Sequence, residues 1–335
     1  MTQLLEDDIG YKTPLGLYLP GMPTIQEEVN LAHQAERLGF NEVWRGIGLF
    51  GRDPLLVLAS IAKETQGIKL GTAIFPIWTR NVADLAGTFA TISEITGPNR
   101  VICGLGSWWE PATTYHGIKR SKPLTAMRET VTSLFRLFNG EKISFQGEFI
   151  RLENAQLNFK NLQEVKIPIC IGAIGDLMLK LAASLADGII INYLLTPDYV
   201  KRAIQIIEME RVNHGKDMYD FLLPQLVHTY LDEDADVALN EARSVVAKHL
   251  SRKNPGHPTV LGVPDDLILE LRNSGVDGGK ELVSDNIVRL FVAAGSANDC
   301  LAKFRDLHRN GCTIPLVFPR GPDPLGTLKP LREGE

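Results

Sequence analysis

The chain has 335 residues, of which 44% are hydrophobic and 22% charged, a composition typical of a folded globular protein and not of a disordered one. Its formal net charge of −5 argues against nucleic-acid binding, which needs a basic surface. No apolar run approaches the roughly 18 residues of a membrane span, and the acidic start MTQLLEDDIGYK is unlike a secretory signal. We therefore expect a soluble, cytoplasmic protein that binds neither membranes nor nucleic acids.

The cysteines show no metal-site or disulfide pattern. Neither a CxxC motif nor a Cys/His ligand spacing occurs, and two of the four cysteines fall in predicted strands. We therefore expect buried free thiols and no bound metal. The four are Cys103, Cys170, Cys300 and Cys312.

Short apolar runs alternate with helical patterns along the whole chain. The first predicted helix has Thr24 and Glu27 in the spacing of a capping box, and the second has Asp53 before Pro54, a typical helix start. The predicted helices cover 24–38, 53–65, 82–95, 123–138, 176–186, 197–213, 234–249 and 298–309. The predicted strands begin near Leu15, Glu42, Ile68, Val101, Ile167, Gly188, Leu222 and Ile314.

Eight strands alternating with helices predict a (β/α)8 TIM barrel, because a doubly wound sheet usually stops at about five or six. No change of composition divides the chain, so we predict one domain over residues 1–335. Two insertions interrupt the rhythm, after strand four (106–160, with a hairpin over 143–159) and after strand seven (251–290). The tails are 1–13 and 319–335. Active sites of such barrels lie at the C-terminal ends of the strands.

The stretch from Leu70 to Pro111 is one strand-helix-strand unit that ends in residues suited to chemistry. Glu110 follows the fourth strand, beside Trp108 and Trp109. A carboxyl group among aromatic rings is desolvated, which raises its pKa and suits it to donate a proton. An ordinary exposed loop glutamate is an equally weighted alternative.

The segment Gly172-Ala173-Ile174-Gly175 follows the fifth strand and opens a helix. Small residues there let backbone N–H groups approach a phosphate, and the helix N-terminus favours the anion. A plain glycine-containing turn is the alternative. On the phosphate interpretation, Gly172→Asp abolishes cofactor binding and leaves the fold intact. The earlier Gly104-Leu105-Gly106 lacks the third glycine of a dinucleotide fingerprint, so a tight turn is favoured there.

Histidines and arginines near strand ends are further candidates. His228, in QLVHTY, either faces the barrel mouth or, as is commoner, is an interior histidine with its hydrogen bonds satisfied. His116 lies in the first insertion, where a lid contact and simple exposure are equally weighted. Four arginines follow strands and either meet anionic ligand groups or, as is favoured for each, form structural ion pairs. They are Arg45, Arg52, Arg80 and Arg320.

Three segments carry a resemblance to a known family. The strand-three to strand-four core of luciferase-like flavin- and deazaflavin-dependent oxidoreductases resembles LGTAIFPIWTRNVADLAGTFATISEITGPNRVICGLG. A similarity to the methylenetetrahydromethanopterin reductases, which use coenzyme F420, lies in the segment HGIKRSKPLTAMRETVTSLFRLFNGEKISFQGEFI. The family's strand-five to strand-six passage is similar to VKIPICIGAIGDLMLKLAASLADGIIINYL. The resemblance covers residues 14 to 320.

The resemblance implies a (β/α)8 barrel, often a homodimer, that holds its cofactor at the C-terminal mouth. It implies a non-prolyl cis peptide bond at Ala73-Ile74 that supports the cofactor ring. It places strand-four loop contacts at Gly106 and Ser107, and a catalytic acid at Glu110. It places the phosphate of the cofactor at Gly172, Ala173, Ile174 and Gly175.

One departure from the family concerns strand two, where an acidic residue or histidine usually follows the tryptophan. Here the sequence reads Trp44-Arg45-Gly46. The resemblance therefore leaves three functions. The first is an F420-dependent oxidoreductase that moves a hydride between the deazaflavin C5 and a small organic substrate such as a methylene-tetrahydropterin. The second is an FMN-dependent monooxygenase, with a flavin reductase as partner. The third is a non-catalytic flavin- or F420-binding protein.

Overall fold

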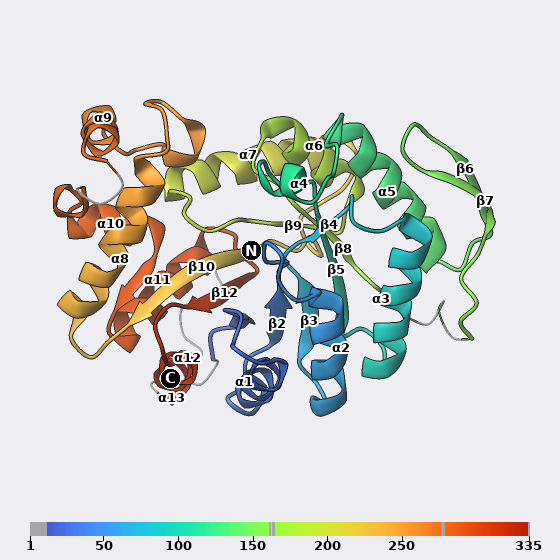
Figure 1. The fold of residues 1–335 in the computed structure, drawn as a ribbon, viewed down its shortest axis with the longest axis horizontal. Coiled ribbons are helices and arrows are strands. Elements are labelled where there is room, and N and C mark those ends of the chain that lie inside the picture. The colour runs from blue at the N-terminus through green and yellow to red at the C-terminus, as the bar shows by residue number, and fades with distance from the viewer. Residues whose placement is uncertain (1–11, 161, 163–164, 276–278, 334–335) are drawn as a thin grey trace. The chain divides into compact units, whose positions relative to one another are not determined.

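The computed structural model describes residues 12–160, 162, 165–275 and 279–333. Within them, helices alternate with parallel strands (Figure 1). The chain forms two compact units. The central unit comprises Gly21–Ile190 and Ile206–Leu222, and the terminal unit comprises Met1–Pro20, Ile191–Gln205 and Leu223–Glu335. Helix α7 (Pro197–Asn213) runs from the terminal unit into the central one.

The central unit is built on a parallel sheet with the strand order β2-β3-β5-β8-β9. The strands are β2 (Glu42–Arg45), β3 (Lys69–Thr72), β5 (Val101–Gly106), β8 (Ile169–Gly172) and β9 (Gly188–Ile190), and the short β4 (Phe75–Pro76) pairs with β5. The helices between them are α1 (Ile25–Arg37), α2 (Pro54–Glu64), α3 (Val82–Thr96), α4 (Ala112–Tyr115), α5 (Pro123–Phe138) and α6 (Asp176–Leu185).

Local sequence explains these elements. Every residue of β5 is buried, which accounts for its continuous apolar run, as in sheets covered on both faces. The capping box of α1 is present: the backbone N–H of Thr24 donates to the Glu27 carboxylate at 2.7 Å, and the Glu27 N–H donates to Thr24 Oγ1 at 3.2 Å. Asp53 caps α2 by accepting from the Leu55 N–H, and Asn81 caps α3 by accepting from the Asp84 N–H.

The terminal unit contains a parallel sheet with the order β11-β10-β12-β1. Its strands are β1 (Gly16–Tyr18), β10 (Pro224–Leu231), β11 (Ala293–Gly295) and β12 (Ile314–Pro319). Apolar side chains of α8 (Ala235–Leu250), α9 (Asp265–Asn273) and α10 (Asp285–Phe291) form a core that packs against β10 and β11. The other elements are α11 (Ala297–Arg309), α12 (Pro324–Leu328), α13 (Pro330–Glu333) and the 3-10 turns η2 (Pro258–Val260) and η3 (Lys280–Leu282).

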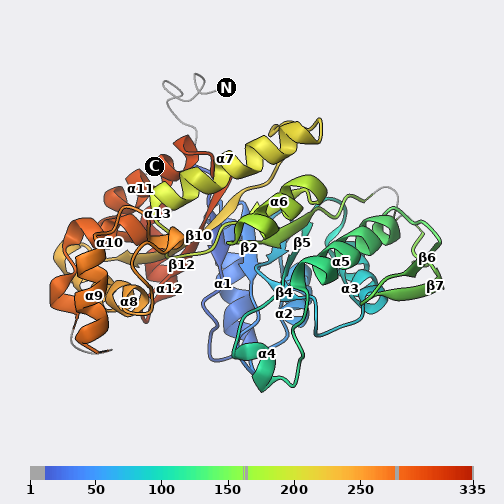
Figure 2. The same ribbon diagram turned by 90° about the horizontal axis from the view of Figure 1, so that it is seen from above.

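The predicted strands and helices are present close to their expected positions. The expected hairpin is also present, as the antiparallel pair β6 (Ile143–Gln146) and β7 (Arg151–Ala155), which lies beside α5 at one end of the central unit (Figure 2). The prediction missed the short strands β4 and β11. The expected C-terminal tail contains α12 and α13, and most of the expected N-terminal tail lies outside the described residues. The single domain and the insertion limits stay predictions.

All four cysteines are buried and free, as predicted. Within the described residues, no helix has both the length and the apolar character that crossing a membrane requires.

Candidate functional site

Ile74 organises the C-terminal ends of three neighbouring strands of the central unit. The peptide bond between Ala73 and Ile74 is cis, as the resemblance implies. A Cβ atom placed on Gly106 would lie 2.6 Å from Ile74 Cγ1, and one placed on Gly172 would lie 2.7 Å from Ile74 Cγ2. Glycine is therefore needed at both positions because the Ile74 side chain occupies the space. The structure thus brings Ala73, Ile74, Gly106 and Gly172 together at the ends of β3, β5 and β8.

This contact corrects the reason given for Gly172. Any side chain at this position meets Ile74 first, so Gly172→Asp disturbs the packing of the strand ends and does not leave the local fold intact. At Gly175, by contrast, an added Cβ atom has no neighbour within 4 Å. The two glycines therefore have different structural requirements.

Ser107 is fixed by two side chains that the sequence analysis did not single out. Its carbonyl oxygen accepts hydrogen bonds from Trp78 Nε1 at 2.9 Å and from Arg120 Nε at 2.8 Å. Its hydroxyl oxygen lies 3.2 Å from Arg120 Nη2. A lone tryptophan after β4 and a lone arginine in a loop carry no local pattern, so only the folded chain identifies them.

The segment from Gly172 to Gly175 leads into α6. Gly175 is the N-cap of this helix and supplies no side chain to cap the first-turn N–H groups. The helix thus begins at the end of β8, and a helix N-terminus favours an anion through its dipole. Ala173 is buried, whereas Ile174 is exposed. The carboxylate of Asp176 lies in the same first turn and opposes a second negative charge there.

Glu110 differs from the expectation. Its carboxylate is exposed and accepts hydrogen bonds from Thr114 Oγ1 at 2.8 Å and from the Thr114 N–H at 3.3 Å. Hydrogen bonds from the Thr113 and Thr114 side chains hold the pKa of Glu110 below its usual range. The predicted desolvation and raised pKa are therefore wrong, because the carboxylate turns toward α4 and solvent and not toward the tryptophan rings. Trp108 is buried and Trp109 exposed.

His116 links two loops at the strand ends. Its ring stacks on Phe50, which follows β2, with 4.6 Å between ring centroids and 14° between planes. Its other neighbour is Trp108, which follows β5, also with 4.6 Å between centroids. His116 Nδ1 is 2.9 Å from the Ala112 carbonyl oxygen. The His116 ring is thus packed between two loops, so simple exposure is wrong, and the lid contact stays a prediction.

The arginine after strand two belongs to a buried ion-pair cluster. The Glu28 carboxylate on α1 is fully buried and accepts from Arg45 Nε at 2.7 Å and from Arg52 Nη1 at 2.9 Å. Where the resemblance leads one to expect an acid or a histidine, this chain therefore has an arginine that is held by α1. Arg80 pairs with Asp53 at 2.5 Å. Structural ion pairs are confirmed for these three arginines.

Arg320 in the terminal unit is the exception. No carboxylate among the described residues pairs with it. Its guanidinium carbon lies 4.9 Å from the centroid of the Phe318 ring, and it interacts with the Tyr230 hydroxyl.

His228 lies next to Arg320 in a cluster of rings. Its ring centroid is 4.5 Å from that of Tyr193 and 4.9 Å from that of Phe318, which in turn is 4.7 Å from Tyr18. The side chain is 5% exposed, and neither ring nitrogen has a hydrogen-bond partner within the described structure. The expectation of a satisfied interior histidine is wrong, because the neighbouring rings offer no acceptor. Burial, aided by Arg320 and His249, lowers the pKa of His228 to about 3.

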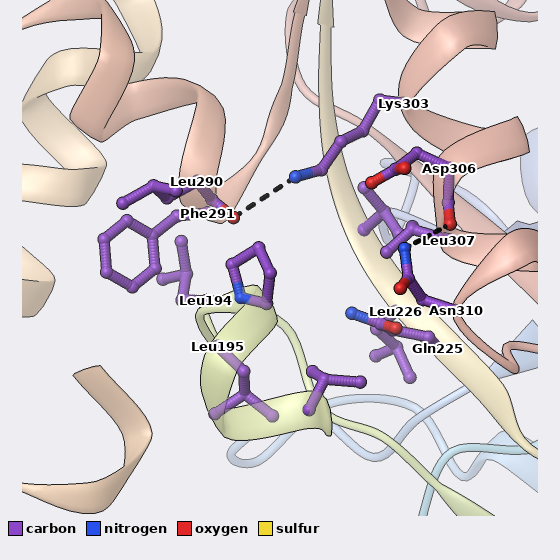
Figure 3. A pocket seen from close by; sticks show the side chains of 13 residues that line it. Leu194, Leu195, Gln225, Leu226, Leu290, Phe291, Lys303, Asp306, Leu307 and Asn310 are labelled. Carbon is purple, nitrogen blue, oxygen red and sulfur yellow. Dashed lines mark hydrogen bonds between the residues drawn. The ribbon is translucent and has the colours of Figure 1, made fainter. Parts of the chain in front are cut away.

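Each of the two units contains a hollow. In the terminal unit, a cavity of about 30 Å³ lies among α7, β10, α10 and α11, where Lys303 donates to the Leu290 carbonyl (Figure 3). It has room for about two water molecules, too little for an organic substrate. In the central unit, an open groove of about 590 Å³ lies between the turn after β4, α5 and the hairpin, and Trp78 lines it.

The comparisons with known proteins agree with this geometry. Residues 8–313 match the family model described as luciferase-like monooxygenase. The chain belongs to the luciferase-like monooxygenase family.

Two relatives in this luciferase-like family are 5,10-methylenetetrahydromethanopterin reductases. That of Archaeoglobus fulgidus is 32% identical over 86% of this chain and 88% of its own. That of Methanolobus tindarius is 28% identical over 93% of this chain and 96% of its own. The solved coenzyme F420-dependent tetrahydromethanopterin reductase of Methanopyrus kandleri has a TM-score of 0.80 at 23% identity, covering 96% of this chain and 98% of that one. This likeness confirms the predicted fold class.

For this luciferase-like chain, the structure divides the sequence-predicted site residues into three groups. Ala73, Ile74, Gly106 and Gly172 lie together at the strand ends, and Ser107 directly follows β5. Ala173, Ile174 and Gly175 lead from β8 into α6. Glu110 belongs to the loop that continues from Ser107, with its carboxylate in solvent.

Proposed function

We propose that the chain is an F420-dependent oxidoreductase that transfers a hydride between the deazaflavin C5 and a small organic substrate. The observation that carries this proposal is the half-buried Ile74 side chain, seated on Gly106 and Gly172 at the ends of three parallel strands. A partly exposed apolar side chain at this edge of the sheet fits one face of a flat ring. Two relatives that match most of this chain are named 5,10-methylenetetrahydromethanopterin reductases.

Each candidate residue has a role in this proposal. Ala73 and Ile74 support the ring. Gly106 leaves room for Ile74, and Ser107, held by Trp78 and Arg120, contacts the edge of the cofactor. The N-terminus of α6, reached through Gly172, Ala173, Ile174 and Gly175, binds the cofactor phosphate at its positive dipole end. Once bound, F420 supplies the hydride chemistry, and the protein supplies position and exclusion of water.

Glu110 is our proposed proton-transferring residue. Because its pKa is held low, the carboxylate is ionised at neutral pH. It is therefore ready to accept a proton in the oxidising direction, and must acquire one before it donates in the reducing direction. Movement of the loop around Pro111 is needed to turn this exposed group toward a substrate.

Three finer statements belong to the same proposal. We propose a methylene-tetrahydropterin as the substrate, in line with the names of the relatives. We propose a homodimer, supported by an open groove between α2 and α3. We propose a cytoplasmic location, since four buried free thiols suit a reducing compartment.

An FMN-dependent monooxygenase is the second candidate, favoured by the matched family model itself. FMN also ends in a phosphate, so the first turn of α6 suits both cofactors. A purely binding role is the third candidate. It is motivated by the position after strand two, where this chain has Arg45, paired with Glu28, in place of an acid or a histidine.

A cofactor titration tests these alternatives. Purified protein is titrated with F420 and with FMN, and binding is followed by cofactor fluorescence. Tight F420 binding with weak FMN binding supports the proposal, the reverse supports the monooxygenase, and binding of neither rejects both. Glu110→Gln then separates catalysis from binding: turnover falls about a hundredfold or more while F420 affinity is kept. Glu94→Gln, an exposed carboxylate on α3, is the matched control.

A further inference from the structure

The terminal unit contains an imidazole whose hydrogen-bonding capacity is unused. His228 is 5% exposed, and neither of its nitrogens has a partner within the described structure. Leaving buried polar atoms unpaired is unfavourable, so such groups in native proteins call for an explanation. Tyr193 and Phe318 pack against the ring and would pack equally well against a phenylalanine. Packing alone therefore does not explain a histidine here.

The same place holds a positive charge that pairs with no carboxylate of the described residues. Arg45 and Arg52 share the Glu28 carboxylate and Arg80 pairs with Asp53, whereas Arg320 lies over the Phe318 ring and reaches the Tyr230 hydroxyl. A half-buried guanidinium without a carboxylate partner is suited to bind an oxygen acceptor of a ligand.

Tyr193 packs against the imidazole and is the most exposed ring of the cluster. It is 38% exposed and lies in a segment outside any helix or strand. Its backbone N–H donates to Asn192 Oδ1 at 2.9 Å, and the next residue, Leu194, has a φ of 56°. A ligand ring that takes the place of the Tyr193 ring would lie against the His228 imidazole, whose centroid is 4.5 Å from that of Tyr193.

We propose that Tyr193, His228, Phe318 and Arg320 form a recognition site for a planar substrate ring that bears a carbonyl or carboxylate oxygen. The ring stacks on the aromatic side chains, and its oxygen accepts hydrogen bonds from Arg320 and from the N–H of the neutral imidazole. A compact, fully hydrated anion such as a sugar phosphate leaves the aromatic walls unused and is disfavoured. The inference rests on the proposed function, from which the class of the ligand ring is taken.

The test uses tetrahydromethanopterin as the probe, titrated by calorimetry into the F420-loaded protein. His228→Phe keeps the ring packing and removes both nitrogens. We expect its affinity for the pterin to fall about tenfold or more, with F420 affinity unchanged. Arg320→Gln should likewise lower the affinity for the pterin with F420 affinity unchanged. Arg320→Lys should lose less pterin affinity because it keeps the charge. His33→Gln, an exposed histidine on α1, is the control for a histidine substitution elsewhere.

Two further measurements complete the test. The melting temperature of His228→Phe should stay equal or rise, since no paired polar group is lost, and glucose 6-phosphate should bind both proteins equally weakly. Three outcomes would each overturn the proposal. In His228→Phe, these are an unchanged pterin affinity or an equal loss of pterin and F420 affinity. In the wild-type protein, it is a failure to bind the pterin. If F420 does not bind but pterin binding depends on His228, the recognition site stands and the proposed cofactor does not.

Discussion

Gly172 and Gly175 are three residues apart and are glycines for different reasons. Gly172 makes room for Ile74, whereas Gly175 has open space around it and begins α6. Only Gly175 can therefore be substituted to test the phosphate site without disturbing the strand ends.

We predict that Gly175→Asp lowers the affinity for F420 at least tenfold. The new side chain can cap the first turn of α6, as aspartate does at other N-caps, and its charge repels a phosphate. Stability should change by only a few tenths of a kcal/mol, because aspartate and glycine are both accepted at N-caps. Fluorescence titration measures the affinity and thermal unfolding the stability. Gly175→Ala, which adds neither charge nor acceptor, is the control, and unchanged F420 affinity in Gly175→Asp would remove phosphate from this helix.

His228 makes the protein sensitive to acid. The pKa of this imidazole is about 3 in the folded chain and near 6.5 in the unfolded chain, so the unfolded chain binds the extra proton between these values. The free energy of unfolding therefore falls as the pH drops below 6.5, by up to about 1.4 kcal/mol per pH unit. Arg320, His249 and Tyr230 surround the ring, and the first two contribute to the lowered pKa.

We predict that, between pH 7 and pH 5, the free energy of unfolding of His228→Phe falls by about 2 kcal/mol less than that of the wild-type protein. Urea unfolding at the two pH values measures the difference. His249, whose pKa is also lowered, remains in the variant, so some acid sensitivity should persist. Identical pH dependence in the two proteins would show that the His228 imidazole titrates normally.

At the scale of elements, Thr72 joins β3 to β5 beneath Ile74. Its hydroxyl group donates to the Gly104 carbonyl at 2.7 Å and accepts from the Gly104 N–H at 2.9 Å. The backbones approach so closely that a Cβ atom on Gly104 would lie 1.6 Å from the Thr72 carbonyl oxygen. This side chain replaces a regular ladder contact and sets how β3 enters the Ala73-Ile74 turn.

We predict that Thr72→Val destabilises the protein by about 1–3 kcal/mol, because it leaves both Gly104 backbone groups without a buried partner. Thr72→Ser keeps the hydroxyl and should lose distinctly less. Denaturant unfolding compares the two variants. If valine is tolerated as well as serine, the hydroxyl bridge does not hold the two strands together.

Other elements were predictable from local signals. The Thr24 and Glu27 capping box, Asp53 before Pro54, and the β6–β7 hairpin depend on residues within a few positions of one another. The short strands β4 and β11 were not predictable, because each forms only through pairing with a distant strand.

At the scale of the whole molecule, the proposed homodimer gives a further prediction. Leu56 on α2 and Ile95 on α3 line the groove between these helices and are 64% and 41% exposed. Apolar side chains at a groove between helices are suited to pack against a second copy.

We predict that Leu56→Glu together with Ile95→Glu converts a dimer into monomers, because charges in an apolar interface lose their hydration. Light scattering after size-exclusion chromatography gives the mass. Val212→Glu, an exposed apolar residue on α7, should leave the dimer intact. A wild-type protein of monomer mass would reject the homodimer.

The sequence by itself determined the alternation of strands and helices, most helix starts, and the family, since these depend on local periodicity and on short motifs. It also located the residues that meet at Ile74, through the resemblance. The tertiary structure decided what each side chain does there. Glu110 is exposed with a lowered pKa, three arginines pair with the carboxylates of Glu28 and Asp53, and His228 has no hydrogen-bond partner among the described residues. These properties depend on burial and on neighbours far away in the chain, which no local pattern encodes.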